Sequence, residues 1–188
     1  EFSVASDIGM NYIELIAEIQ HNIENPIWSD NGIKKIKELA KNYNLSIHAL
    51  CNDYIVKNHF LLEEVIEQNI RLLLQGEKLG VDKYIMPFFE SSELTSDNMT
   101  DYLDPIIRVA KVASDKNILI CLETILNGQE LINLLDLINM TNVKIVYDTG
   151  NRVAFGHDLS HDIRLLNEQI VHVHIKDKNK DNENVLLG

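Results

Sequence analysis

The sequence predicts an α/β protein of the (β/α)8 TIM-barrel type. Short apolar runs alternate with amphipathic helical patterns along all 188 residues, an order that builds a parallel sheet through right-handed crossovers. The runs are nearly continuous in apolar residues, as is typical of strands that are covered on both faces. A full barrel of eight units takes ~250 residues, so a chain of this length corresponds to about six units.

Six apolar runs are predicted to be the strands of this sheet. In chain order they are Tyr12–Ala17, Ser46–Cys51, Lys83–Phe88, Ile118–Glu123, Lys144–Asp148 and Ile170–Ile175. Their number agrees with the number of units that the chain length allows.

Helical patterns fill the segments between these strands. Apolar residues recur at helical spacing in Asn31–Tyr43, Leu61–Leu79, Asp97–Lys116, Gln129–Asn139 and Leu159–Asn167, and an apparent helix, Phe2–Ile8, precedes the first strand. Gly80 follows the second of the five segments and suits a C-terminal cap. Pro105 lies inside the third, where it predicts either a kink or the start of a second helix.

Two architectures fit the alternation, a doubly wound open sheet and a (β/α) barrel. The chain starts in a helix with no strand before it, and it stops after a strand and a polar loop. We therefore interpret residues 1–188 as a single, partial TIM-barrel domain that lacks the first strand and the last unit. Exposed sheet edges favour association, so a homo-oligomer is among the expected partners.

Composition argues against several classes of protein. Asp and Glu number 29 against 17 Lys and Arg, and the net charge of −12 repels the phosphate backbone of nucleic acids. No apolar run approaches the ~20 residues of a membrane span, and no signal peptide is visible. Cys51 and Cys121 lie far apart inside apolar runs. We therefore expect free, buried thiols in a cytoplasmic protein rather than a disulfide.

Three polar residues stand at the ends of consecutive predicted strands. Glu123 ends the fourth strand, Asp148 ends the fifth and His174 lies near the end of the sixth. The spacings of 25 and 26 residues place all three at one height, on the edge where parallel α/β folds carry their active sites. Taken singly, each residue also has an ordinary structural interpretation: a solvated or salt-bridged glutamate, an aspartate in a turn, or a hydrogen-bonded core histidine. Together, two carboxylates and an imidazole are a typical ligand set for a divalent metal ion.

Several stretches resemble one known family. ICLET (Ile120–Thr124), VYDTGN (Val146–Asn151) and VHVHIKD (Val171–Asp177) are similar to motifs of the xylose-isomerase-like TIM barrels. This superfamily of sugar and sugar-phosphate isomerases and epimerases also holds endonuclease IV and dehydratases of cyclic polyols. The resemblance extends along nearly the whole chain through IGMNYIEL (Ile8–Leu15), ALCNDY (Ala49–Tyr54), IMPFFESSEL (Ile85–Leu94) and NVLLG (Asn184–Gly188).

The resemblance implies a metal site made of Glu, Asp, His and a second Glu. The first three map onto Glu123, Asp148 and His174, and the fourth has no counterpart before the chain ends. A hard, oxygen-rich set with one imidazole suits Mn²⁺ or Mg²⁺, with Co²⁺ or Zn²⁺ as alternatives. The implied reaction is isomerisation or epimerisation of a sugar or sugar phosphate through an enediolate, with Glu123 as the base.

Five further residues near the predicted strand ends are candidate substrate contacts, namely Lys176, Asn151, Glu90, Asn52 and Glu14. Lys176 could equally be an exposed loop lysine and Asn151 a turn residue. His172 shares strand parity with His174 one layer deeper, and we interpret it as a hydrogen-bonded core histidine rather than a ligand.

Two other functions stay open. An endonuclease IV-like metal phosphodiesterase resembles this chain in fold, but such an enzyme has a richer histidine cluster, and the net charge of −12 also counts against it. A barrel fragment that acts as a non-catalytic binding module would follow from the missing strands.

Overall fold

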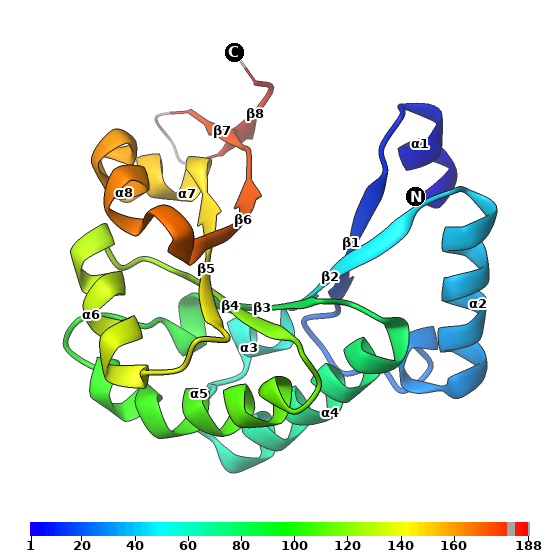
Figure 1. Ribbon diagram of the computed structural model, residues 1–188, viewed down its shortest axis with the longest axis horizontal. Helices are drawn as coiled ribbons and strands as arrows, with labels where there is room; N and C mark the ends of the chain where they lie inside the picture. The colour runs from blue at the N-terminus through cyan, green and yellow to red at the C-terminus, as the bar shows by residue number, and fades with distance from the viewer. Residues whose placement is uncertain (180–182, 188) are drawn as a thin grey trace.

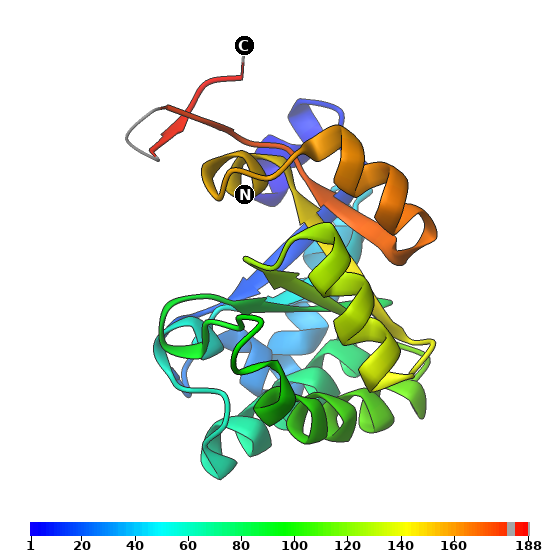
Figure 2. The same ribbon diagram turned by 90° about the vertical axis from the view of Figure 1, so that its left-hand side faces the viewer.

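The computed structural model describes residues 1–179 and 183–187. Six parallel strands form one sheet, which curls into a half-barrel with helices on its outside (Figure 1, Figure 2). The strands are β1 (Tyr12–Ala17), β2 (Ser46–Asn52), β3 (Lys83–Phe88), β4 (Leu119–Thr124), β5 (Val143–Asp148) and β6 (Ile170–His174). They pair in chain order from β1 to β6. A doubly wound sheet reverses its strand order at a switch point, so this order confirms the barrel alternative.

The strand predictions hold to within one residue at every end. Strand β4 is shifted by one residue at both ends, and β6 ends at His174 rather than at Ile175. A short antiparallel pair, β7 (Asp177–Lys178) and β8 (Asn184–Val185), follows β6 and was not predicted. Gly188, the last residue of the stretch NVLLG, lies outside the described residues.

The longer helices lie where the sequence pattern predicts them. They are α1 (Phe2–Asp7), α2 (Asp30–Asn42), α4 (Glu63–Leu79), α5 (Met99–Ser114), α6 (Gly128–Ile138) and α8 (Leu159–Leu166). The pattern missed the shorter helices α3 (Tyr54–Lys57), α7 (Thr149–Ala154), η1 (Pro26–Trp28), η2 (Glu90–Ser92) and η3 (Asn167–Gln169). Among the described residues, no helix combines the length and the apolar composition that crossing a membrane requires.

Local sequence explains how these helices begin and end. Gly80 closes α4 with a φ of +88°, a conformation that glycine adopts without a steric penalty. Asn127 and Glu130 form a capping box at the start of α6. Helix α5 continues through Pro105 without a second helix starting there. Proline removes only one hydrogen bond, to the carbonyl of the exposed Asp101, which water can satisfy.

The apolar residues form two layers, one on each face of the sheet. The larger layer lies between the strands and the outer helices and contains Leu50, Tyr84 and Leu122. The smaller layer lies inside the half-barrel and consists of Ala49, Cys51, Ile85, Cys121 and Val146. Both cysteines are free and buried, as predicted. The polar residues of the candidate site lie next to this inner layer, inside the half-barrel.

The half-barrel is open on one side. Within the described residues β1 pairs only with β2, and β6 pairs only with β5. The two strands stand on opposite sides of the opening, with β3 and β4 at its base (Figure 1). Side chains from β1 and β6 can therefore face each other across the interior.

Candidate functional site

The three predicted metal ligands converge inside the half-barrel. Glu123 lies on β4, and Asp148 at the end of β5 pairs in register with His174 on β6. His174 Nδ1 lies 3.6 Å from Glu123 Oε2 and 3.6 Å from Asp148 Oδ2. The potential ligand atoms of all three residues lie within 4.8 Å of one another. The structure thus brings together the set that the strand spacing singled out.

The turn from β5 into α7 holds this arrangement in place. Asp148 caps α7, because its Oδ1 accepts a hydrogen bond of 2.9 Å from the backbone N–H of Asn151. The Thr149 hydroxyl bonds the backbone N–H and carbonyl of Lys176 at 3.1 Å each. A Cβ on Gly150 would lie only 2.8 Å from Lys176 Cβ. The stretch DTGN therefore lets the segment after β6 pack directly against the end of β5.

Asn151 orients the carboxylate of Glu123. Its side-chain Nδ2 donates a hydrogen bond of 2.9 Å to Glu123 Oε1, which leaves Oε2 facing His174. Glu123 is only 6% exposed. The carboxylate is therefore held in one orientation and is largely shielded from bulk water.

The two carboxylates of this group are electrostatically different. Burial raises the pKa of Glu123 above its usual range. Burial alone would also raise the pKa of Asp148. Hydrogen bonds to His174, the Asn151 backbone and Lys176 outweigh burial, however, and hold that pKa well below its usual range. Glu123 is thus the carboxyl group of the pair that takes up a proton more readily.

Lys176 lies at the mouth of the site. Its Nζ is 2.6 Å from Asp148 Oδ2, and its side chain is 40% exposed. Burial alone would lower the pKa of Lys176, but the contact with Asp148 raises it. The ammonium group is therefore charged, and it can meet both Asp148 and a molecule that enters from solvent.

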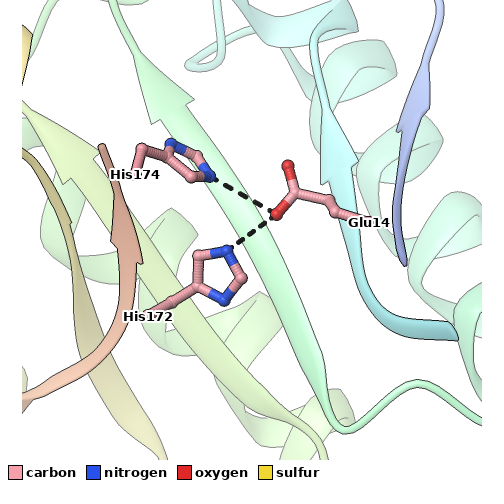
Figure 3. A group of neighbouring side chains, drawn as sticks. All are labelled: Glu14, His172 and His174. Atoms are coloured by element: carbon pink, nitrogen blue, oxygen red, sulfur yellow. Dashed lines mark hydrogen bonds and ion pairs between the residues drawn. The ribbon is translucent and has the colours of Figure 1, made fainter. Parts of the chain in front are cut away.

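A second group of potential ligands faces the first across the interior. Glu14 Oε2 lies 2.9 Å from His172 Nε2 and 3.4 Å from His174 Nε2 (Figure 3). Potential ligand atoms of these three residues also lie within 4.8 Å of one another. His174 belongs to both groups, since its Nδ1 faces Glu123 and Asp148 while its Nε2 faces Glu14.

The position of Glu14 follows from the geometry of the barrel. Glu14 is the third residue of β1 and lies inside the half-barrel, below the mouth where we expected it. Strands of a TIM barrel are staggered by about one residue per strand. The stagger accumulates from β1 to β6, and it brings an early residue of β1 level with His172 and His174. The available sequence signal was a charged residue inside an otherwise apolar strand.

Asn52 and Glu90 do not join this group. Asn52 follows the inward-facing Cys51 on β2, so it faces the outer helices, where it is fully buried and lines a small cavity together with Leu72 of α4. Glu90 lies in η2, is exposed and forms an ion pair with Lys57. The structure therefore assembles Glu14, Asn151 and Lys176 at the site, but neither of these two residues.

Arg152 supports the site from behind. Its guanidinium is 3% exposed, donates to the backbone carbonyl of Leu126 and lies 3.6 Å from Asp162 Oδ2. It also lies 5.1 Å from the centre of the Tyr147 ring. Asp162 Oδ1 accepts a hydrogen bond of 3.1 Å from the Gly128 N–H. We call Arg152 and Asp162 the buried clamp, because they join the loop after β4 to α7 and α8.

The donor set around His174 fits a divalent metal ion. Glu123 and Asp148 present hard carboxylate oxygens, and His174 presents one imidazole nitrogen. Two nearby carboxylates, both almost inaccessible to water, are unfavourable unless cations balance them. A divalent ion with coordination positions left for a ligand matches this chemistry.

Several known proteins are similar to this chain in sequence or in fold. Inosose dehydratase from Clostridium tetani (strain Massachusetts / E88) is 26% identical over 132 residues, which cover 67% of this chain and 44% of the dehydratase. The chain therefore spans less than half the length of this curated relative. The xylose isomerase domain protein from Planctomyces limnophilus superposes with a TM-score of 0.81 at 12% identity, over 100% of this chain and 76% of that one. D-psicose 3-epimerase from Clostridium cellulolyticum H10, solved with D-tagatose, has a TM-score of 0.76 at 17% identity, over 93% of this chain and 66% of that one.

The family assignment rests on nearly the whole chain. A family model described as xylose isomerase-like TIM barrel matches residues 2–186. The matched segment includes the ICLET, VYDTGN and VHVHIKD stretches that carry the resemblance in the sequence. The chain therefore belongs to the xylose isomerase-like TIM barrel family.

Proposed function

We propose that this protein is a divalent-metal-dependent sugar or sugar-phosphate isomerase or epimerase. The observation that carries the proposal is the convergence of Glu123, Asp148 and His174 within 4.8 Å inside the half-barrel. The reaction consists of moving a proton on a carbon atom beside a carbonyl group, through an enediolate. Such a proton is too weakly acidic for a carboxylate in water to remove at a useful rate.

Glu123 is the proposed base. Asn151 donates a hydrogen bond to Oε1 of Glu123, so this oxygen is fixed. The other oxygen, Oε2, faces the interior of the half-barrel and His174. Its buried setting raises the pKa of the carboxyl group, which makes the carboxylate a stronger base near neutral pH. A bound divalent ion would supply positive charge to the substrate oxygen on which negative charge develops.

The remaining residues hold and orient the reactants. Asp148 and His174 would serve mainly as metal ligands. Lys176, whose Nζ is now paired with Asp148, is the proposed contact for a substrate hydroxyl or phosphate oxygen. A metal ion on Asp148 would take over that charge balance and leave the ammonium group for the substrate.

A dehydratase is a second candidate function. The observation that favours it is the 26% identity to inosose dehydratase over 67% of this chain. Dehydration begins with the same proton removal beside a carbonyl and then expels a hydroxyl group from the next carbon as water. The residues proposed for isomerisation would serve the first step without rearrangement.

The test is exchange of a carbon-bound proton with solvent. With Mn²⁺, the protein should introduce deuterium from heavy water into a ketose or ketose phosphate beside its carbonyl group, as NMR or mass spectrometry would detect. Loss of water from a keto-polyol would select the dehydratase. Cleavage of abasic DNA, without exchange in any ketose, would instead support a metal phosphodiesterase. If the whole protein does none of these, the binding-module hypothesis is the better one.

A further inference from the structure

We infer that Glu14 is a positioning residue, whose carboxylate holds the Nε2–H side of His174 and thereby turns its Nδ1 toward Glu123 and Asp148. The inference rests on the proposed metal site and adds to it a residue from the opposite wall of the half-barrel. The two strands involved do not pair within the described part of the chain, and Glu14 and His174 lie 160 residues apart.

The hydrogen-bonding chemistry of the three side chains determines which nitrogen carries a proton. An ionised carboxylate only accepts hydrogen bonds, so a ring nitrogen that bonds to it must be a donor. Glu14 Oε2 lies 3.4 Å from His174 Nε2 in a hydrogen bond. In neutral imidazole the other nitrogen then carries the lone pair. That nitrogen, Nδ1, lies 3.6 Å from both Glu123 Oε2 and Asp148 Oδ2.

His172 holds Glu14 in this position. The same oxygen, Oε2, lies 2.9 Å from His172 Nε2, and the two imidazole rings stand edge to face with centroids 5.1 Å apart (Figure 3). Glu14 therefore bridges two histidines that alternate along β6 on the same face. Such carboxylate–histidine pairs fix the tautomer and the orientation of a metal-ligating imidazole.

The alternative is that Glu14, His172 and His174 bind the ion themselves. A neutral imidazole has one lone pair and can direct it either toward Glu14 or toward the two carboxylates on the other side. Glu123 and Asp148 together offer two anionic ligands there, whereas Glu14 offers one. The charge balance therefore favours the ion at Nδ1 and the proton at Nε2.

The first measurement is Mn²⁺ affinity of the whole protein, by titration calorimetry or by the electron paramagnetic resonance of free Mn²⁺. Glu14→Leu should weaken binding about 10–100-fold, and Glu14→Gln should weaken it less, because its amide oxygen can still accept from Nε2–H. Glu77→Gln, which removes an outer carboxylate paired with Lys116, is the charge-matched control and should leave the affinity unchanged. Thermal unfolding shows whether each variant folds, and Glu14→Gln provides the test if Glu14→Leu does not.

The second measurement asks whether Glu14 acts through His174. In a His174→Ala background, Glu14→Leu should cause no further loss of affinity, because there is no imidazole left to position. A further loss of the same size would overturn the inference, and so would equal effects of Glu14→Gln and Glu14→Leu, since charge alone would then explain them.

His172 separates positioning from direct ligation. His172→Phe should weaken Mn²⁺ binding far less than His174→Ala does. An equal loss would place the ion between Glu14 and the two histidines and overturn the inference, while leaving a metal site in the protein. A wild-type protein that binds no Mn²⁺ would instead overturn the proposed function, and this inference with it.

Discussion

Asp148 and Arg152, four residues apart on the β5–α7 segment, belong to two groups of charged residues that differ in composition. Asp148 belongs to the candidate site, and Arg152 belongs to the buried clamp. Around Asp148, the carboxylates of Glu14, Glu123 and Asp148 face the side chains of His172, His174 and Lys176. In the buried clamp, one guanidinium faces one carboxylate, and both are almost fully enclosed. The ion pair of the clamp needs no further molecule, whereas the three carboxylates of the site face one lysine and two histidines, whose charge depends on their protonation.

The difference indicates which charges serve the fold and which serve a ligand. Arg152 is surrounded by partners from the chain itself, namely the Leu126 carbonyl, Asp162 and the Tyr147 ring. In the site, burial raises the pKa of Glu123, so the folded protein opposes the charge on that carboxylate. A group that is unfavourable in the folded state is a sign of function rather than of stability. Substitutions in the site should therefore affect activity more than stability, and substitutions in the buried clamp should affect stability.

The largest expected effect is on catalysis. Glu123→Gln should lower the rate of deuterium exchange by about 10²–10⁴-fold, because an amide cannot accept the proton. The fold should not be weakened, since the amide oxygen can still accept from Asn151 and the buried charge is gone. The melting temperature should therefore be unchanged or higher. If Glu123→Gln loses exchange only because the protein unfolds, Glu123 serves the fold as the buried clamp does, and the distinction between the two groups is wrong.

The next effect is on stability. Arg152→Met should lower the free energy of unfolding by about 3–5 kcal/mol, because it leaves the carboxylate of Asp162 buried without its partner. Urea unfolding would measure this. Arg108→Met, which removes an exposed arginine paired with Glu63 and Glu67, is the matched control and should change stability far less. Equal losses in the two variants would contradict the structural role of the clamp.

Most of the fold could be predicted because burial on both faces leaves a strong signal in the sequence. The strands of the half-barrel read as continuous apolar runs, and the observed ends lie within one residue of the predicted ones. The short helix α7 was missed because its six residues carry little periodicity. Instead, side-chain hydrogen bonds define it, from Asp148 as its cap to Asn151 on Glu123.

Only the part of the site that follows local spacing could be predicted. Glu123, Asp148 and His174 stand at the ends of neighbouring strands, so counting residues was sufficient to associate them. The contact of Glu14 with His172 depends on the accumulated stagger of six strands, which no local pattern contains. Asn52 lies at a strand end as predicted, but it faces the outer helices.

A smaller effect should come from the residue that links the turn to the base. Asn151→Ala removes the hydrogen bond to Glu123 Oε1 and should lower the exchange rate about 10-fold, the value of one hydrogen bond to a charged group. Stability should hardly change. Asn133→Ala, which removes an exposed amide paired with Gln129, is the control. If both substitutions leave exchange unchanged, the orientation of Glu123 does not depend on Asn151.

A further expected effect is a dependence of stability on pH in the metal-free protein, and its origin lies in His174. Burial alone would lower the pKa of His174, but hydrogen bonds to Asp148 and Glu14 raise it to about 10, from an ordinary value of 6.5. Because the folded-state pKa lies above the unfolded one, the stabilisation is complete below about pH 6.5 and is lost as the pH rises toward 10.

Urea unfolding at pH 6 and at pH 10 should therefore show a loss of stability that is smaller in His174→Gln than in the wild type. The comparison with this variant is needed because other groups also titrate near pH 10. Metal ligation requires the Nδ1 proton to leave, so saturating Mg²⁺ should reduce the difference between the two proteins. Parallel losses with and without the imidazole would mean that His174 does not carry a proton shared with Asp148 and Glu14. The contrast between the carboxylate-rich site, which we propose binds a cation, and the buried clamp, whose ion pair needs no cation, would then be weaker.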